Sequence, residues 1–466
     1  MIAAVLAFLA FVFCVVATPV CRDFFVKRGW VDQPDEKRKL HPTPVPRSGG
    51  IGIFAAYFAS LAVVYLSSGA AVYVQHQALL RAVLPATALV FLLGLADDLL
   101  DLKPRHKLLV QAIAAVMAVS LGARLSMHHG PSWLSALLSI AWLLACTNAV
   151  NLIDGMDGLA TGVGLTATVT TLLLALLSGN TGLALTTAPL AGALLAFLRY
   201  NFAPASVFLG DSGSLTIGFL LGCLGLVWSG RSGAWGMLGP LLTLALPLLD
   251  VNLSIGRRFL RSVPIFSGDR GHIHHRVQDL GLSTRGAAFL LYGCCVLFAM
   301  LAVLQAFLNR WIEISLVLLF VAVVVYGIKH LGYVEFRAVR RTLSHGAIRR
   351  AVKEEIHLEE MRRALSTADT PEQCWAVVRR TCEELHITTV QMKLCGVRFI
   401  QHPFGSSQEP SCTVHVPLGE DSWLLLAGPV SVAPQAITAA LQPIQLAMQD
   451  RLPLLRKQQE SLRQAA

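Results

Sequence analysis

Long apolar segments recur along the first two thirds of the chain and are separated by short polar ones. Hydrophobic residues make up 55% of the 466 positions and charged residues only 14%, which excludes a water-soluble globular fold for most of the chain. Runs of about 20 apolar residues are long enough to cross a bilayer as helices. The pattern predicts an all-α polytopic membrane protein with about eleven transmembrane helices. The expected spans are roughly 2–20, 50–66, 82–96, 108–122, 133–147, 159–177, 182–198, 214–228, 235–250, 286–307 and 311–328.

Basic residues alternate between rich and poor connections along this series of spans. The first, third, fifth and later odd-numbered connections hold most of them, whereas the even-numbered connections hold only Arg81, Arg124, Arg231 and Arg310. Cytoplasmic loops carry the excess of Lys and Arg in membrane proteins. We therefore expect the N-terminus outside and the C-terminus inside. The net charge of +10 also favours contact with anionic lipid headgroups.

Five short polar stretches lie at the edges of the expected spans, all on the cytoplasmic side. They cover residues 32–50, 96–101, 148–159, 208–214 and 269–276. A charge at the bilayer centre costs about 2.5–3.5 kcal/mol on insertion scales, so carboxylates and cations gathered at one face indicate chemistry there. A transporter is the rival class, but its carboxylates tend to lie near the midplane beside broken helices.

An acidic cluster follows the third expected span. Asp97 and Asp101 are expected to share a helix face, with Asp98 adjacent. Clustered carboxylates repel one another unless a hard cation or a basic partner is close. The alternative is a polar helix end that stops the span, although Asp is unfavourable at a helix C-terminus. The cluster therefore indicates metal or phosphate chemistry.

Two further polar stretches add oxygen ligands on the same face. One repeats Asn and Asp at a spacing of three, which on a helix gives neighbouring positions, at Asn148, Asn151, Asp154 and Asp157. The other, at 210–214, combines glycines and serines with Asp211. A calcium loop needs a spacing of two and a terminal Glu. Mg²⁺ is usually held by one or two carboxylates plus substrate phosphates, so a Mg²⁺–diphosphate site is favoured.

A basic loop at 269–276 carries three histidines, His272, His274 and His275, beside Arg276. Zinc is one reading, but no matching Cys is present and the acidic stretches favour a hard metal. The neighbouring charges indicate a phosphate or sugar contact instead.

Six ordered motifs together resemble those of the polyprenyl-phosphate N-acetylhexosamine-1-phosphate transferases, integral-membrane enzymes that begin bacterial glycan-lipid synthesis. They are R-K-x-H-x-x-P-x-P-R-x-G-G at 38–50, D-D-x-x-D at 97–101, N-x-x-N-x-x-D-G-x-D-G-L at 148–159, G-D-S-G-S at 210–214, P-L-L-D at 247–250 and H-I-H-H-R-V-Q-D-L-G-L-S at 272–283. The resemblance covers about residues 1–340.

The resemblance implies attack of a polyprenyl phosphate on the β-phosphate of a UDP-sugar, giving a polyprenyl-diphospho-sugar and UMP. It implies Mg²⁺ as cofactor, with Mn²⁺ as an alternative. The implied catalytic residues are Asp97 and Asp98, and the implied metal contacts are Asn151 and Asp211. The implied nucleotide and sugar contacts are Asp154, Asp157, Phe208, His272, His274, His275 and Arg276. The implied lipid-phosphate contacts are Lys39, Arg47 and Lys107. A phosphate monoester is already mostly ionised near neutral pH, so we expect positioning and charge neutralisation to outweigh base catalysis by either aspartate.

The H-I-H-H-R segment resembles the branch that uses UDP-N-acetylglucosamine. The alternative is the phospho-N-acetylmuramoyl-pentapeptide transferase of peptidoglycan synthesis, which more often has three consecutive histidines there. The implied partners are undecaprenyl phosphate, UDP-N-acetylglucosamine, membrane lipids and a second copy of the chain, with no nucleic acid. The implied location is the bacterial inner membrane, with the active face in the cytoplasm.

Composition changes after the last expected span. We expect a transmembrane transferase domain at 1–332 and a cytosolic domain at 333–466, with a linker helix at about 337–363 and an α/β module at about 364–466. A helix at 371–385, strands at 388–394, 411–417 and 423–427, and a final helix at 434–456 give a layout similar to a GAF-type sensor. A structural or dimerisation role is expected for it. The ten cysteines show no disulfide or metal pattern.

Overall fold

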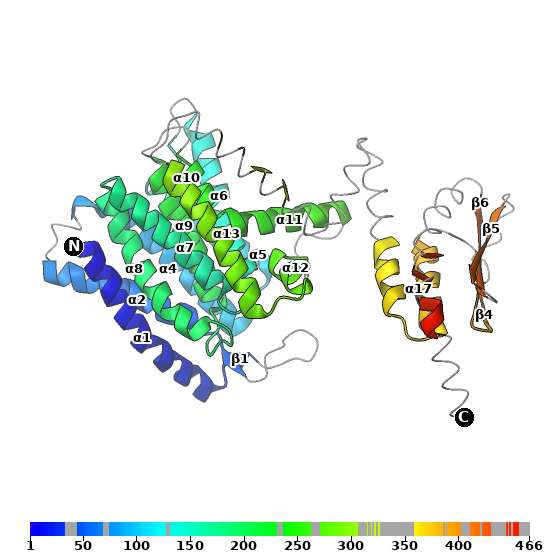
Figure 1. The fold of residues 1–466 in the computed structure, drawn as a ribbon. Helices are drawn as coiled ribbons and strands as arrows, with labels where there is room; N and C mark the ends of the chain where they lie inside the picture. Colours follow the sequence, from blue (N-terminus) through cyan, green and yellow to red (C-terminus); the bar gives the residue numbers. More distant parts are fainter. Residues whose placement is uncertain are drawn as a thin grey trace. The chain divides into compact units, whose positions relative to one another are not determined.

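Helices dominate the computed structural model of the chain (Figure 1). It describes residues 1–32, 44–68, 74–126, 131–230, 236–261, 271–305, 358–384, 389–401, 411–419, 422–429 and 451–455, with residue 387 and isolated positions at 315–326 and 444–448. The chain divides into two compact units, Met1–Gly256 with Phe266–Leu331, and Arg257–Ile265 with Gly332–Ala466.

The elements up to residue 305 are mostly long helices joined by short connections. In order they are α1 (Ile2–Arg28), β1 (Val31–Asp32), β2 (Val45–Pro46), α2 (Gly49–Ser68), α4 (Gln77–Leu100), α5 (Pro104–Ser120), α6 (Ser132–Ile153), α7 (Leu159–Leu177), α8 (Thr181–Asn201), α9 (Gly210–Ser229), α10 (Leu238–Thr243), α11 (Ala245–Arg261), α12 (Ile273–Asp279) and α13 (Thr284–Gln305). Local signals fix several ends. Pro104 begins α5, where a missing N–H costs nothing, and the Asn180 side chain caps α8 by accepting the Leu183 amide.

Eight helices among the described residues are long and apolar enough to cross a membrane, namely α1, α2, α4, α6, α7, α8, α9 and α13. The predicted count of eleven spans is not confirmed. Helix α5 has only 17 residues, and the expected span at 235–250 is divided between α10 and α11 at Leu244. Most of the expected span at 311–328 lies outside the described residues.

Helix α9 is the most enclosed of these spans. In its most apolar stretch 94% of the residues are buried, against 22% for α1. Helices α2, α4, α6 and α7 pack on α9, whereas α1 packs on α2 and α8 at the edge of the bundle (Figure 1). Gly94 of α4 lies so close to α9 that a Cβ there would sit 2.5 Å from the Asp211 carbonyl oxygen and the Ser212 Cα. The polar stretches at 96–101 and 208–214 therefore meet.

The N-terminal polar stretch is tied to the same place by backbone hydrogen bonds. Strands β1 and β2 form a short antiparallel ladder. The Phe208 amide donates to the Pro46 carbonyl oxygen, and the Gly49 and Gly50 amides donate to the carbonyl oxygens of Phe208 and Leu209, each at 3.0 Å. Two segments that are far apart in the sequence thus lie side by side at the start of α9.

The second unit contains a four-stranded antiparallel sheet in the order β4-β3-β6-β5. Its elements are α17 (Pro371–Glu384), β3 (Thr389–Leu394), β4 (Val397–Gln401), β5 (Ser411–Gly419) and β6 (Ser422–Pro429), preceded by helical residues 358–367. One sheet face packs against the helices around Met361, Leu365, Val378, Val390, Met392, Leu424 and Leu426. The helix and three strands expected here are present, and β4 was not predicted. The GAF-type resemblance stays a prediction, and most of the linker helix at 337–363 and of the final helix lies outside the described residues.

Candidate active site

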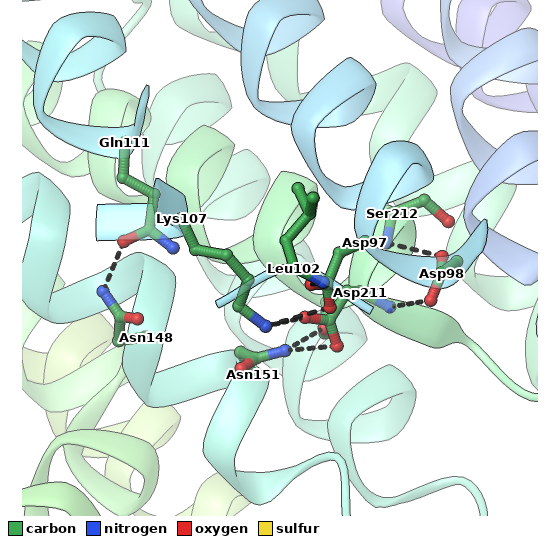
Figure 2. A network of polar contacts seen from close by, with 10 residues as sticks. Asp97, Asp98, Leu102, Lys107, Gln111, Asn148, Asn151, Asp211 and Ser212 are labelled. Atoms are coloured by element: carbon green, nitrogen blue, oxygen red, sulfur yellow. Dashed lines mark hydrogen bonds and ion pairs between the residues drawn. The ribbon is translucent and has the colours of Figure 1, made fainter. Parts of the chain in front are cut away.

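Two carboxylates converge on one lysine where α4, α5 and α9 meet (Figure 2). The Lys107 ammonium lies 3.0 Å from Asp97 Oδ2 and 2.5 Å from Asp211 Oδ2. The other Asp97 oxygen accepts the Leu102 amide at 2.9 Å. All three side chains are largely shielded, with 11–24% of each exposed, so their charges interact more strongly than they would in open solvent.

Asp98 points into the first turn of α9. Its two carboxylate oxygens accept the backbone amides of Asp211 at 2.8 Å and Ser212 at 2.9 Å (Figure 2). These are amides that α9 itself cannot satisfy, and the carboxylate also suits the positive end of the helix dipole. Gly210 makes this contact possible, because its φ of +71° is a left-handed conformation and a Cβ there would lie 2.7 Å from Asp98 Oδ2.

Asn151 at the end of α6 completes the cluster. Its Nδ2 donates to Asp211 Oδ1 at 3.0 Å and to Ser214 Oγ at 2.9 Å (Figure 2). Asn148, one turn earlier, donates instead to Gln111 Oε1 at 2.7 Å and to the Leu144 carbonyl oxygen at 2.8 Å. The two asparagines therefore serve different neighbours.

The regularly spaced residues of the acidic motifs do not lie on a single helix face. Helix α6 ends at Ile153, so Asp154 is its C-cap residue and Asp157 follows in a turn. Asp157 Oδ2 accepts the Ala205 amide at 2.9 Å. The expectation that Asp101 shares a face with Asp97 is wrong, because α4 ends at Leu100 and Asp101 turns into a left-handed conformation, exposed to solvent.

Asp154 nevertheless belongs to the electrostatics of the cluster. Burial raises the pKa of its carboxyl well above the usual range, and the nearby negative charges of Asp211 and Asp98 act in the same direction, while Arg47 opposes them. Arg47 is itself bonded to Asp32 Oδ1 at 2.8 Å. A phosphate group brought close to these residues would therefore meet both a cation and a carboxyl that favours its protonated form.

The remaining predicted contacts lie just before α9, in or next to α12, or outside the described residues. Phe208 precedes α9, and its backbone joins the N-terminal stretch described above. Lys39 lies outside the described residues. His272 precedes α12, and the rings of His274 and His275 lie 4.2 Å apart.

His274 is almost fully buried, and neither of its ring nitrogens has a hydrogen-bond partner among the residues that the structure describes. Burial lowers the pKa of His274 to about 4, and the neighbouring His275 acts in the same direction. The ring is therefore neutral at physiological pH.

The residues at the cluster fit a hard divalent cation. Two carboxylates, Asp97 and Asp211, already face one cationic group, the Lys107 ammonium. Within the described ranges no three His, Cys, Asp or Glu side chains form a metal-binding group, but Mg²⁺ bound with substrate phosphates needs only one or two carboxylates. The Asn151 side-chain nitrogen donates both hydrogen bonds that the side chain makes to Asp211 and Ser214, so its amide oxygen offers a further ligand of the right kind.

Several supporting residues have no role that the sequence motifs indicate. Gln111 and Gly94 lie inside apolar runs, where nothing in their local pattern marks them, and Ser214 was recognised only as the last residue of the motif at 210–214. Asp250 was recognised only as part of a motif. Gln111 and Ser214 could have been found from the rule that a buried polar side chain needs a partner.

Comparison with known proteins assigns the chain to a family. Residues 80–229, which span the site from α4 to α9, match the family described as Glycosyl transferase family 4. The chain is 32% identical over 331 residues to the "Probable undecaprenyl-phosphate N-acetylglucosaminyl 1-phosphate transferase" of Bacillus subtilis (strain 168), covering 69% of this chain and 90% of that protein. The chain belongs to this family.

Two further proteins are similar to the chain. The "Decaprenyl-phosphate N-acetylglucosaminephosphotransferase" of Mycobacterium tuberculosis (strain ATCC 25618 / H37Rv) is 33% identical over 310 residues, 59% of this chain and 76% of that protein. The "Undecaprenyl-phosphate alpha-N-acetylglucosaminyl 1-phosphate transferase" of Escherichia coli (strain K12) is 29% identical over 323 residues, 65% of this chain and 83% of that protein. The resemblance drawn from the motifs is confirmed. The muramoyl-pentapeptide alternative is not favoured, because these names specify N-acetylglucosamine.

Proposed function

We propose that the protein transfers N-acetylglucosamine-1-phosphate from UDP-N-acetylglucosamine to undecaprenyl phosphate, giving undecaprenyl-diphospho-N-acetylglucosamine and UMP. The observation that carries the proposal is the convergence of Asp97, Lys107, Asn151 and Asp211 from four helices at one end of the bundle. Membership of a family whose similar relatives are named for this transfer supports the substrates.

In the proposed reaction an oxygen of the lipid phosphate attacks the β-phosphorus of the UDP-sugar. A new P–O bond joins the lipid phosphate to that phosphorus, and the bond from the β-phosphorus to the oxygen bridging to the α-phosphorus breaks. The bridging oxygen leaves with UMP. Because all reacting groups are anionic phosphates, positioning and charge neutralisation are the main demands on the protein.

Lys107 is placed to meet these demands. Its ammonium is the cation nearest to both Asp97 and Asp211 among the described contacts, and it can exchange a carboxylate for a phosphate oxygen as substrate enters. Asp97 orients the lysine, while Asp98 orients the first turn of α9 through backbone amides. Neither aspartate needs to remove a proton from a phosphate monoester that is already mostly ionised.

Mg²⁺ is the proposed cofactor, with Mn²⁺ as an alternative, and Asp211, Asn151 and Asp97 are its proposed ligands. When bound, the ion neutralises charge on the diphosphate and orients it. The protein residues around it keep the two carboxylates and the lysine in one shielded place.

The chain is proposed to reside in the bacterial inner membrane with more spans than the eight described, its N-terminus outside and the active face in the cytoplasm. The alternation of basic connections supports this orientation. The unit after residue 332 is proposed to be a cytosolic domain of GAF type, and the assembly a homodimer.

Release of UMP tests the proposed function. Purified protein is given undecaprenyl phosphate, Mg²⁺ and either UDP-N-acetylglucosamine or UDP-N-acetylmuramoyl-pentapeptide. The proposal expects turnover of the first donor alone, loss of that turnover in Asp211→Asn, and normal turnover in Asp23→Asn, which changes an exposed carboxylate at the end of α1. UMP from the second donor only, or from neither donor, contradicts it.

A further inference from the structure

A buried carboxylate outside the cluster holds the histidine segment. Asp250 of α11 is only 1% exposed. Its Oδ1 accepts the Ile273 backbone amide at 2.8 Å, and its Oδ2 lies 2.9 Å from His272 Nδ1. Asp250 is the last residue of the P-L-L-D motif at 247–250, and the motif itself does not indicate a role for it.

The contact with Asp250 places a hydrogen on Nδ1 of His272. A carboxylate only accepts hydrogen bonds, so the Nδ1 of His272 carries a hydrogen and donates it to Asp250. In the neutral ring the opposite nitrogen, Nε2, is then a hydrogen-bond acceptor. The Ile273 contact also ties the start of α12 to α11, because Ile273 is the first residue of that helix.

The segment held in this way lies against the turn that follows Asn151. The rings of His272 and His274 are nearly parallel, with centroids 5.7 Å apart. His274 in turn touches the turn so closely that a Cβ on Gly155 would lie 2.8 Å from its Nε2. Gln278 Nε2 of α12 donates to Met156 Sδ at 3.4 Å. Asp250 therefore sets the position of the histidines relative to the segment that carries Asn151 and Asp154.

The acceptor on His272 suits one part of the proposed donor substrate. The diphosphate of a UDP-sugar offers only acceptors near neutral pH, whereas an N-acetylhexosamine offers hydroxyl groups and an amide N–H as donors. The Nδ1–H tautomer of His272, which presents Nε2 as an acceptor, therefore complements the sugar and not the diphosphate.

We propose that Asp250 is a positioning residue for donor recognition: it holds His272 in the Nδ1–H form so that Nε2 accepts a hydrogen bond from the hexosamine. This inference rests on the proposed function, because it takes the nucleotide sugar as the ligand. It predicts that Asp250 affects the KM for the nucleotide sugar and does not affect the KM for the lipid substrate.

The Asp250→Asn variant tests the inference with little change of shape. The Asn oxygen still accepts the Ile273 amide, but its NH₂ group now faces His272 Nδ1, which must become the acceptor. The hydrogen moves to Nε2, and the acceptor offered to the sugar becomes a donor. We expect the KM for UDP-N-acetylglucosamine to rise about tenfold, the loss of one hydrogen bond, with the KM for undecaprenyl phosphate changed less than about twofold.

The His272→Asn variant separates the positioning of the histidine segment by Asp250 from recognition of the sugar by the imidazole. Its amide nitrogen replaces Nδ1 as donor to Asp250, but it has no group at the Nε2 position. We expect the same rise in donor KM, and a double variant with Asp250→Asn no worse than His272→Asn alone. Asn252→Ala, an exposed position on the same helix, is the matched control and should behave as wild type.

The tautomer is read directly from ¹⁵N NMR of histidine-labelled protein in detergent. The inference expects Nδ1–H at His272 in wild type and Nε2–H in Asp250→Asn. It is overturned by Nε2–H in the wild type, by an unchanged donor KM in Asp250→Asn, or by equal loss toward both substrates together with a lower unfolding temperature, which marks a purely structural role. A wild-type protein that shows the Nδ1–H form but releases no UMP contradicts the proposed function and overturns the assignment of Asp250 to donor recognition with it.

Discussion

Asp98 binds the backbone of Asp211: its carboxylate accepts the Asp211 amide at 2.8 Å and so joins the last turn of α4 to the first turn of α9. The second oxygen accepts the next amide of α9. Adjacent aspartates in the sequence thus have different tasks. Asp97 faces the lysine at the centre of the cluster, whereas Asp98 fixes the helix that presents Asp211.

Replacing Asp98 should therefore act through the position of Asp211. In Asp98→Asn one oxygen becomes an NH₂ group that faces a backbone N–H, so one charge-assisted hydrogen bond is lost and two donors oppose each other. We expect kcat to fall about 10- to 100-fold and the unfolding temperature to fall with it. UMP release and thermal unfolding in detergent measure both. Asp101→Asn is the control, since that exposed residue has a left-handed backbone that Asn tolerates. An inactive Asp98→Asn protein of unchanged stability would instead mean that Asp98 meets the substrate directly.

Gly210→Ala should damage the same junction. The left-handed φ costs a residue with a Cβ about 1–2 kcal/mol, and the Cβ would lie within 2.8 Å of both Asp98 oxygens. We expect a lower unfolding temperature and loss of most activity. Gly230→Ala, at the other end of α9 with φ −61° and its nearest contact at 3.5 Å, is the matched control. Equal behaviour of the two variants would contradict this account of the junction.

Much of this site could be predicted from the sequence, because helices of apolar residues leave their polar ends at the membrane edge. The grouping of Asp97, Asn151 and Asp211 follows from that rule and from the motifs. Spacing alone did not show where helices stop. Asp101 and Asp157 fit the repeats, yet α4 and α6 end before them, and the two side chains turn to solvent or to a backbone amide.

The partners of each side chain could not be predicted, because they depend on contacts between distant segments. Lys107 was expected to meet the lipid phosphate, but nothing in its own sequence shows that it lies between Asp97 and Asp211. The break at Leu244 likewise lies inside an apolar run that has the length of one span.

Lys107→Gln should separate charge neutralisation from metal binding. Without the ammonium, Asp97 and Asp211 face each other with no cation between them, so their oxygens should attract a divalent cation more strongly. We expect kcat to fall about 100-fold, as for loss of one group that stabilises developing charge, while the Mg²⁺ concentration for half-maximal rate decreases. A Mg²⁺ titration of UMP release measures both values. Arg105→Gln, an exposed position on the same helix, is the control. An unchanged kcat in Lys107→Gln would remove the lysine from the mechanism.

Low pH should destabilise the protein through His274. Burial lowers the pKa of this ring to about 4 in the folded protein, whereas an unfolded histidine titrates near 6.5. The unfolded state therefore binds the proton first. The stability that depends on neutral His274 is complete above about pH 6.5 and decreases toward pH 4, by about 2 kcal/mol at pH 5.

Thermal unfolding at pH 8 and pH 5 checks this. Between pH 8 and pH 5 the unfolding temperature of the wild-type protein should decrease more than that of His274→Gln, which carries no titrating ring. Equal losses in the two proteins would show that His274 does not control the acid sensitivity.

In the proposed reaction the β-phosphate of the nucleotide sugar moves with the sugar to the lipid. UDP-N-acetylglucosamine labelled with ³²P at the β-phosphate tests it most directly, with extraction of the lipid after incubation with purified protein, undecaprenyl phosphate and Mg²⁺. We expect the label to enter the lipid fraction in equal amount to the N-acetylglucosamine, with unlabelled UMP as the other product. Label that stays in the aqueous phase as UDP while the sugar enters the lipid would show transfer of the sugar alone and would rule out the proposed reaction.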